Sequence, residues 1–483
     1  MALLAGGCTP AAKTGDAIRF GLAAAPVTLD PRFATDATSA RINRLLYARL
    51  VDFDPRLRPV PALARWERLT PLHYRFHLDP DRRPFHDGTP LTAADVKATY
   101  EFILDPEQGS PHRAALAVVR RIDAPDRDTV DFFLNHPDPL FPGKLVIGIL
   151  PAARMAAGHP FNTRPLGSGP FAFGAWPEPG RLRLLRLRDR QVVEFVRSKD
   201  PTVRLLKLMR GELDLVQNDL PPELVRYAKR QEALRVSFGE GTNFSYLGFN
   251  LQDPLLKDRR VRQAIAHAID RPAIIEHMLG GGARLASALL PPDHWAGVAL
   301  PACAYDPERA RALLREAGWG GRRRPHLVYK TSADPFRIRL ATVILQQLSE
   351  VGFEAELKSY DWGTFYGDIK AGRFQMYSLA WVGIKTPDIF RYVFHSRSVP
   401  PGGANRGRYV STVADRLIEQ AEAAPTLVQQ ARHYAALQRH LFAELPYVPL
   451  WYEDHVVVAR ADIRGYPIAR DGNYDGLIQV RRQ

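Results

Sequence analysis

The chain of 483 residues is poor in the features that define several common classes of protein. Its two cysteines, Cys8 and Cys303, cannot form a disulfide framework, and no Cys-x-x-Cys motif is present. No run of 18 apolar residues occurs, which excludes a transmembrane helix in this sequence. Gly-x-Ser-x-Gly, His-Glu-x-x-His and Walker motifs are also absent, and the 14 histidines are dispersed. We therefore predict no catalytic residues, no metal site and no cofactor.

The composition is that of an ordinary soluble protein, with 46% apolar and 24% charged residues. The length favours two or three domains. The net charge is +14, and arginine supplies 55 of the 66 basic residues. Such an excess is typical either of a nucleic-acid-binding protein or of a solvated arginine-rich surface. Because the arginines are scattered, we favour the surface and predict no nucleic-acid partner.

Cys8 follows the sequence Leu-Leu-Ala-Gly-Gly, which resembles a lipobox, the site of diacylglycerol attachment. The preceding segment is shorter than a signal peptide and has no basic residues. Two interpretations stay open: a lipoprotein whose start codon lies further upstream, or a disordered N-terminus in which Cys8 occurs by chance. Residues 9–16 are small and polar, which is typical of a tether.

The most informative stretch is residues 82–104, which predicts a turn followed by a capped helix. Thr92 is the expected N-cap, and Asp95 stands at the third helical position, where its carboxylate completes a capping box. Leu91 and Val96 have the spacing of a hydrophobic staple. These local signals predict a helix over residues 93–104.

The second half of the chain alternates between predicted strands and predicted helices. We expect strands at 326–330, 354–359 and 374–381, separated by helices at 336–351 and 362–371. This alternation predicts βαβ units and a mainly parallel sheet. Strands expected at 242–250 and 446–458 are candidates for the crossings between domains.

Several of these stretches resemble one known family. The sequence FHDGTPLTAADV at residues 85–96 resembles the signature of the bacterial extracytoplasmic solute-binding proteins of family five. These are the peptide, dipeptide and nickel receptors of ABC importers. Residues 27–55, 164–171 and 205–223 are also similar to this family, and the resemblance extends from about residue 18 to residue 480. It implies an α/β, two-lobed periplasmic-binding-protein fold with an extra small subdomain on the first lobe, in which the ligand is enclosed when the lobes close.

The resemblance also implies a division of the chain into domains. We expect a signal remnant and tether at 1–17, and the extra subdomain at 51–160. Lobe II is expected at 249–448. Lobe I then comprises three segments, at 18–50, 161–248 and 449–483.

The expected ligand-binding residues lie in the family-like loops and near the predicted crossings. They are Val27, Thr28, Tyr246, Asn250, Trp381, Ile384, Asp388 and Tyr452. Each aromatic residue taken alone is more typical of a core, but pockets between domains are commonly aromatic. With the resemblance, we favour the cleft for Trp381 and Tyr452.

One loop departs from the pattern of the family. Peptide receptors of this type often carry an Asp three residues after a Trp, where it holds the ligand's α-ammonium, but this chain has Ile384 there. The basic residue that some members place three positions before the Trp is Ser378. Asp388 either replaces the missing acid or caps a helix at 389–394.

The function that follows is capture of a peptide or peptide-like solute for an ABC importer. The expected partners are the ligand, a membrane permease and, if Cys8 is lipidated, the membrane itself. We expect a monomer in the periplasm or at the outer face of a bacterial membrane. The alternatives are a receptor for a non-peptide solute, or a ligand-sensing or enzymatic protein that uses the same fold.

Overall fold

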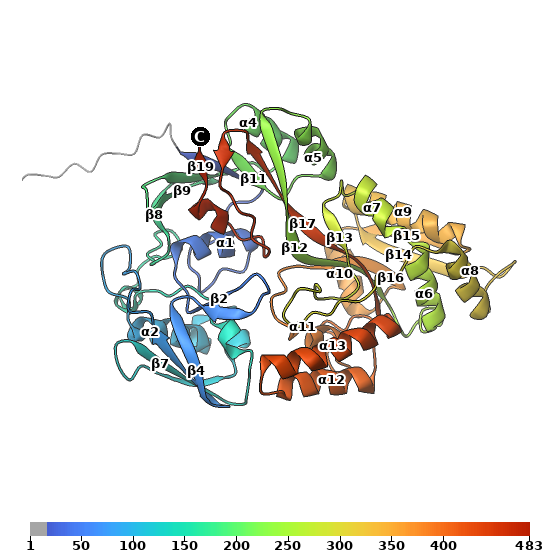
Figure 1. The fold of residues 1–483 in the computed structure, drawn as a ribbon, viewed down its shortest axis with the longest axis horizontal. Coiled ribbons are helices and arrows are strands. Elements are labelled where there is room, and N and C mark those ends of the chain that lie inside the picture. The colour runs from blue at the N-terminus through green and yellow to red at the C-terminus, as the bar shows by residue number, and fades with distance from the viewer. Residues whose placement is uncertain (1–16) are drawn as a thin grey trace, which may run out of the picture.

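A single mixed sheet of eleven strands runs through both halves of the computed structural model, which describes residues 17–483 (Figure 1). Its order is β15-β14-β16-β12-β17-β11-β1-β10-β9-β8, with β13 paired to β17. The two long strands β12 (Leu234–Phe249) and β17 (Tyr447–Arg460) are antiparallel neighbours and contribute to both lobes. The lobes are therefore joined by paired strands as well as by their surfaces.

Lobe I is built around the parallel pairing of β1 with β10 and β11. Its apolar core includes Phe20, Leu45, Leu182 and Phe195. The C-terminal strands β18 and β19 close this lobe. The elements are β1 (Ile18–Leu22), α1 (Ala37–Leu46), β8 (Phe171–Glu178), β9 (Arg181–Arg186), β10 (Val192–Arg197), α4 (Pro201–Met209), β11 (Leu215–Gln217), α5 (Pro222–Lys229), β18 (Ile463–Arg464) and β19 (Arg481–Arg482).

A small subdomain with its own apolar core is attached to lobe I, at the lower left of Figure 1. Its four-stranded antiparallel sheet has the order β4-β5-β7-β6 and is packed against helix α2. The elements are β2 (Val51–Phe53), β3 (Pro59–Pro61), β4 (Ala64–Thr70), β5 (His73–Leu78), α2 (Ala93–Leu104), β6 (Val119–Asp123), β7 (Thr129–Leu134) and α3 (Ala152–Ala156).

Helix α2 has the bounds and the capping box that its sequence predicts. The Thr92 backbone N–H donates to the Asp95 carboxylate at 2.8 Å, and Leu91 and Val96 are both buried. Asp95 also accepts from the Ala152 N–H at 2.8 Å, so the cap ties α2 to α3. The family-like loop before α2 is fixed in turn, because the His86 N–H donates to the Gly167 carbonyl at 2.8 Å.

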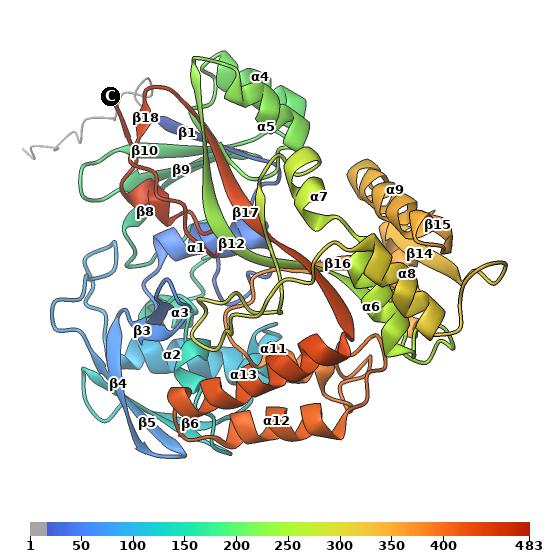
Figure 2. The same cartoon turned by 45° about the vertical axis from the view of Figure 1, so that its right-hand side comes forward.

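Lobe II places helices on both faces of the strands β14, β15 and β16. The helices α6 to α9 and the helices α10 to α13 belong to separate apolar cores. Figure 2 shows α6, α8 and α9 on one side of this lobe and α11, α12 and α13 on another. The elements are α6 (Arg259–Ala268), α7 (Arg271–His277), β13 (Ala283–Leu285), α8 (Pro307–Glu316), β14 (His326–Ser332), α9 (Pro335–Glu350), β15 (Glu354–Tyr360), α10 (Trp362–Ala371), β16 (Met376–Trp381), α11 (Ile389–Phe394), α12 (Thr412–Ala423) and α13 (Leu427–Glu444).

The expectation of a mainly parallel sheet in the second half is correct only locally. β14 is parallel to both β15 and β16, as βαβ units require. β16, however, is antiparallel to β12, and β12 is antiparallel to β17, so the sheet as a whole is mixed. The long strand β12, which comes from lobe I, is antiparallel to the adjacent βαβ strand β16. The alternation of predicted strands and helices gives no information about this pairing.

The chain passes between the lobes where the ladder of β12 and β17 is irregular. Pairing is regular up to Gly239, opposite His455, and resumes at Asn243, opposite Glu453. A Cβ atom at Gly241 would lie 2.1 Å from the Glu453 carbonyl oxygen, so only glycine allows this close approach.

Candidate ligand cleft between the lobes

A cavity between the lobes, which we call the hinge cavity, has a volume of about 770 Å³. Lobe I contributes Ala37, Arg41 and the segment 218–222, and lobe II contributes Ser332 and the start of α9. The crossing strands β12 and β17 form the rest of the wall, with Asn243 and residues 453–456. A ligand in this cavity would touch both lobes and the strands between them.

Acidic side chains predominate in the hinge cavity. Four carboxyl residues line it, against two arginines: Asp219, Asp334, Glu453 and Asp454, and Arg41 and Arg337. Glu453 accepts from the Ser245 hydroxyl at 2.8 Å and lies 3.8 Å from the Arg337 guanidinium. Asp454 is held by Arg284 at 2.8 Å.

His455, which lines the hinge cavity, connects β17 with two other segments of lobe I. Its Nδ1 accepts from the Asn218 amide at 3.0 Å, and its Nε2 donates to the Arg470 carbonyl at 2.9 Å. Both contacts suit the neutral ring, and burial lowers the pKa of His455 below its usual value. The ring therefore positions the chain without adding charge.

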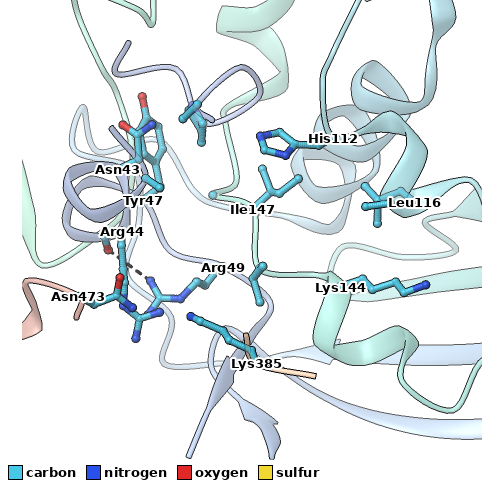
Figure 3. Close-up of a pocket in the computed structure, with 16 residues that line it drawn as sticks. Asn43, Arg44, Tyr47, Arg49, His112, Leu116, Lys144, Ile147, Lys385 and Asn473 are labelled. Atoms are coloured by element: carbon cyan, nitrogen blue, oxygen red, sulfur yellow. Dashed lines mark hydrogen bonds between the residues drawn. The ribbon is translucent and has the colours of Figure 1, made fainter. Parts of the chain in front are cut away.

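A second cavity of about 360 Å³, which we call the basic pocket, lies between α1, the subdomain and lobe II. Figure 3 shows Arg44, Arg49 and Lys385 gathered on one side, with His112 and Ile147 across from them. The lining residues are Pro31, Ala34, Ala40, Asn43, Arg44, Tyr47, Arg49, His112, Ala115, Leu116, Lys144, Val146, Ile147, Gly148, Lys385 and Asn473. None of them is an aspartate or a glutamate.

Carboxylates outside the lining hold the arginines of the basic pocket in place. Arg44 donates to Asp475 and to Asp52, each at 2.8 Å, and Arg49 donates to the same Asp52 at 2.6 Å. Burial raises the pKa of Asp52, but the two arginines outweigh it and bring the pKa down to about 2. Burial and the neighbouring Arg44 lower the pKa of Arg49.

Polar contacts between the lobes lie around both cavities. Lys385 of lobe II donates to Asp471 of lobe I at 2.7 Å, and Arg470 donates to Asp293 at 2.9 Å. Beside the hinge cavity, Arg226 of α5 donates to the carbonyl of His277 at the end of α7, at 2.7 Å. The lobes are thus in direct contact through a few groups that can separate.

Two of the expected site residues, Tyr246 and Trp381, lie together on lobe II. Their rings are stacked with centroids 6.3 Å apart, and the Arg406 guanidinium lies 4.8 Å from the Trp381 ring. Arg406 also donates to the Tyr246 hydroxyl at 3.1 Å. Neither aromatic residue lines the hinge cavity or the basic pocket.

The loop after Trp381 reaches the basic pocket through Lys385 and not through Ile384. Ile384 is 8% exposed and belongs to the apolar core of lobe II. Asp388 precedes α11 and accepts from the Thr386 hydroxyl at 2.5 Å, with no side-chain hydrogen bond to the helix. Asp388 thus stands at the N-cap position of the expected helix at 389–394, but its side chain makes no capping hydrogen bond.

The remaining expected residues lie outside both cavities. Val27 is 79% exposed, and its N–H and that of Thr28 donate to the Ser39 hydroxyl at the start of α1. Asn250 donates to the Gly372 carbonyl at 3.2 Å, beyond the end of β12. Tyr452 is 2% exposed and donates to the carbonyls of Ala288 and Leu290, so its hydroxyl is already satisfied within lobe II.

The match to a known family now decides which class of protein this is. Residues 57–399, more than half of the chain, match the family described as bacterial extracellular solute-binding proteins, family 5 Middle. The chain belongs to this family. Its members are solute receptors, and the two-lobed fold is the one seen in their solved structures.

Individual members of the solute-binding family are similar along most of their length. A probable di/tripeptide-binding protein of Pseudomonas aeruginosa is 28% identical over 481 residues, covering 91% of this chain and 90% of the relative. A putative ABC transporter peptide-binding protein of Brucella ovis is 27% identical, covering 86% and 83%. Among solved structures, the ABC transporter substrate-binding protein CtaP of Listeria monocytogenes has a TM-score of 0.84 at 23% identity, covering 96% and 99%.

Two further searches concern the described part of this solute-binding protein, residues 17–483. None of its helices is long and apolar enough to cross a membrane. Within the same residues, no group of three or more His, Cys, Asp or Glu side chains is arranged to hold a metal ion. Cys8 lies outside the described residues, and Cys303 is a free, half-buried thiol.

Sequence reasoning missed the residues that line the basic pocket. Arg44, Arg49 and Lys144 lie in three different local contexts, and no motif links them to Lys385. One signal was nevertheless present in the sequence: Lys385 directly follows Ile384, the position at which the family's carboxylate is missing.

Proposed function

We propose that this protein captures a peptide or peptide-like solute between its lobes and delivers it to the permease of an ABC importer. The observation that supports the proposal is the interface between the two lobes, which we call the seam and which includes the residues lining the hinge cavity and the basic pocket. Two cavities lie along it, each lined by residues of both lobes, and α1 contributes to both. A solute bound there would favour the closed arrangement because it contacts both lobes at once.

The names of the relatives support a peptide ligand. The Pseudomonas aeruginosa and Brucella ovis proteins are named as di/tripeptide-binding and peptide-binding. A receptor for a non-peptide solute is the second candidate. It is favoured by the loop after Trp381, where Ile384 offers no carboxylate to a peptide's amine.

We further propose that the protein works outside the cytoplasm, as a monomer and without bond chemistry, and that Cys8 is its lipid attachment site. Expression with the upstream codons and labelling with palmitate tests the anchor. The label should be lost in Cys8→Ser, and equal labelling of both proteins would refute the anchor.

Two measurements on the full chain test the receptor function. Mass spectrometry of small molecules released from the purified, denatured protein should find peptides or peptide-like compounds. X-ray scattering should show a smaller radius of gyration once a released compound is added back at saturating concentration. An unchanged profile under saturation would contradict a receptor that closes on its ligand.

A further inference from the structure

The basic pocket is polarised toward a negatively charged ligand group. Its titratable lining residues are Arg44, Arg49, Lys144, Lys385, His112 and Tyr47, and the lining contains no carboxylate. Burial lowers the pKa of His112, which keeps its ring neutral near pH 7. The volume of about 360 Å³ lies within the range of small-molecule pockets.

The four cations have four carboxylate partners, all of which lie behind the lining. Lys385 is paired with Asp471 and Lys144 with Asp138, while Asp52 is shared between Arg44 and Arg49. Arg44 has Asp475 as a second carboxylate partner, whereas Arg49 has only the shared carboxylate and a 3.3 Å hydrogen bond to the Arg44 carbonyl. The buried Nε of Arg49 also has no hydrogen-bond partner.

Asn43 provides a second, independent indication of a ligand. It lines the basic pocket, is 5% exposed, and neither its amide nitrogen nor its amide oxygen has a hydrogen-bond partner. Buried polar groups are nearly always satisfied, because an unpaired one loses its bonds to water without replacement. An unpaired amide beside an incompletely paired guanidinium can bind an oxyanion through N–H donors on both groups.

We propose that the basic pocket receives a carboxylate at one end of the bound solute. The inference rests on the proposed receptor function and adds the substrate class: peptide-like molecules with an acidic end group. Arg49 and Asn43 supply N–H donors to the carboxylate, and Lys385 brings a positive charge from lobe II. Because Lys385 comes from the opposite lobe, an acidic ligand also draws the lobes together.

A competition experiment on the full chain isolates the carboxylate from every other feature of the ligand. The probe is an equimolar mixture of tripeptides of Ala, Leu and Phe with three kinds of ends: N-acetyl with C-terminal amide, N-acetyl with free carboxylate, and N-succinyl with C-terminal amide. The protein is equilibrated with the mixture, separated from free peptide, and the bound fraction is quantified by mass spectrometry. At least one of the two acidic forms should be enriched about tenfold over the neutral form, as expected for a charge-assisted contact.

Variants assign that preference to the basic pocket. Lys385→Met and Asn43→Leu should reduce the enrichment, and Lys385→Met with Asp471→Asn should reduce it without leaving an unpaired carboxylate. Lys330→Met is the matched control, because Lys330 forms a 2.7 Å ion pair with Asp368 in the same lobe and lines neither cavity. A role of Lys385 in closure alone would lower the binding of neutral and acidic forms equally.

The outcomes separate the inference from the function on which it rests. If the wild type binds tripeptides but takes the neutral form as well as the acidic ones, the inference is wrong and the receptor function stands. An enrichment that persists in both Lys385→Met and Asn43→Leu overturns it too. Binding of no tripeptide of any form would refute peptide capture and the inference together.

Discussion

The two cavities along the seam differ in the sign of the charges that line them. The hinge cavity has four carboxyl residues and two arginines, whereas the basic pocket has four cations and no carboxylate. We therefore expect a solute that spans the seam with charged ends to bind with its cationic end at the hinge. The family's Asp after Trp381 is replaced by Ile384 in this chain. The carboxyl residues of the hinge cavity lie on the same seam and could contact a ligand's amine instead.

The largest effect is expected from dismantling the basic pocket itself. Arg44→Met leaves Asp475 unpaired and deprives Asp52 of one partner in a mostly buried site. Removing one member of a buried ion pair costs about 3–5 kcal/mol, so denaturant unfolding should show a loss of this order. Arg311→Met, which breaks an exposed pair with Glu308, is the control and should change stability by no more than about 0.5 kcal/mol. Equal losses would mean that Arg44 has no special structural role.

The stability of the fold around the loop that carries Lys385 should depend on pH through the titration of His294. This ring is 2% exposed, donates through Nε2 to the Lys385 carbonyl at 3.1 Å, and accepts at Nδ1 from the Ala296 N–H. Burial lowers its pKa from 6.5 to about 4. A depressed histidine pKa stabilises the fold above pH 6.5, and this contribution is lost as the pH falls from 6.5 to 4.

The expected loss at pH 4 from His294 is about 3 kcal/mol, following from the shift of the pKa. The stability of the wild type and of His294→Gln should be compared by denaturant unfolding across this range. The variant should be less stable at pH 7 and should lose less stability on acidification. Parallel curves for the two proteins would show that His294 does not carry the dependence.

The opposite end of the seam is tested by Glu453→Gln, which removes a charge from the hinge cavity. The amide oxygen can still accept from the Ser245 hydroxyl, so the local structure should be kept. Affinity for tripeptide amides with a free N-terminal amine should fall about tenfold, while their N-acetyl forms should be unaffected. Glu356→Gln, outside both cavities, is the calorimetric control. A fall shared by both peptide forms would contradict an amine site at the hinge.

The smallest effect is expected at the rim of the seam. Arg339 of α9 and Glu223 of α5 bridge the lobes at 2.9 Å, but both side chains are about half exposed. Such pairs contribute between 0 and about 1 kcal/mol, so Arg339→Gln should weaken ligand binding by no more than a few-fold. Calorimetry at low and high salt should show this small difference disappearing as salt rises. A loss of affinity as large as that caused by Lys385→Met would show that the main contact between the lobes is the one between α5 and α9.

Sequence reasoning predicted the parts of the fold that depend on neighbouring residues. The capping box of α2 lies within a few residues of the helix that it starts, and the helices predicted at 336–351 and 362–371 are present as α9 and α10, each to within one residue. The antiparallel pairing of β12 with β16 depends on residues more than a hundred positions apart, which no local pattern reveals.

The site was harder to predict than the fold for the same reason. The basic pocket draws its charged residues from α1, the subdomain and the loop of Lys385, and their approach depends on how three bodies pack. The sequence signals used for the cleft were aromatic residues and the family-like loops. Tyr452 shows why that signal is weak, since its ring is packed within lobe II and its hydroxyl is satisfied by backbone carbonyls.

The pairing of β12 with β17 limits how this receptor can move. If the crossings were two independent linkers, the lobes could slide, twist and separate in many combinations. Here the crossings are adjacent strands of one hydrogen-bonded ladder, whose register shifts between Gly239 and Asn243 and again between Ser245 and Tyr246, so the two strands have to bend together. The lobes would then move relative to each other mainly by a change of one hinge angle. A permease that docks on both lobes could distinguish the ligand-bound protein by that angle.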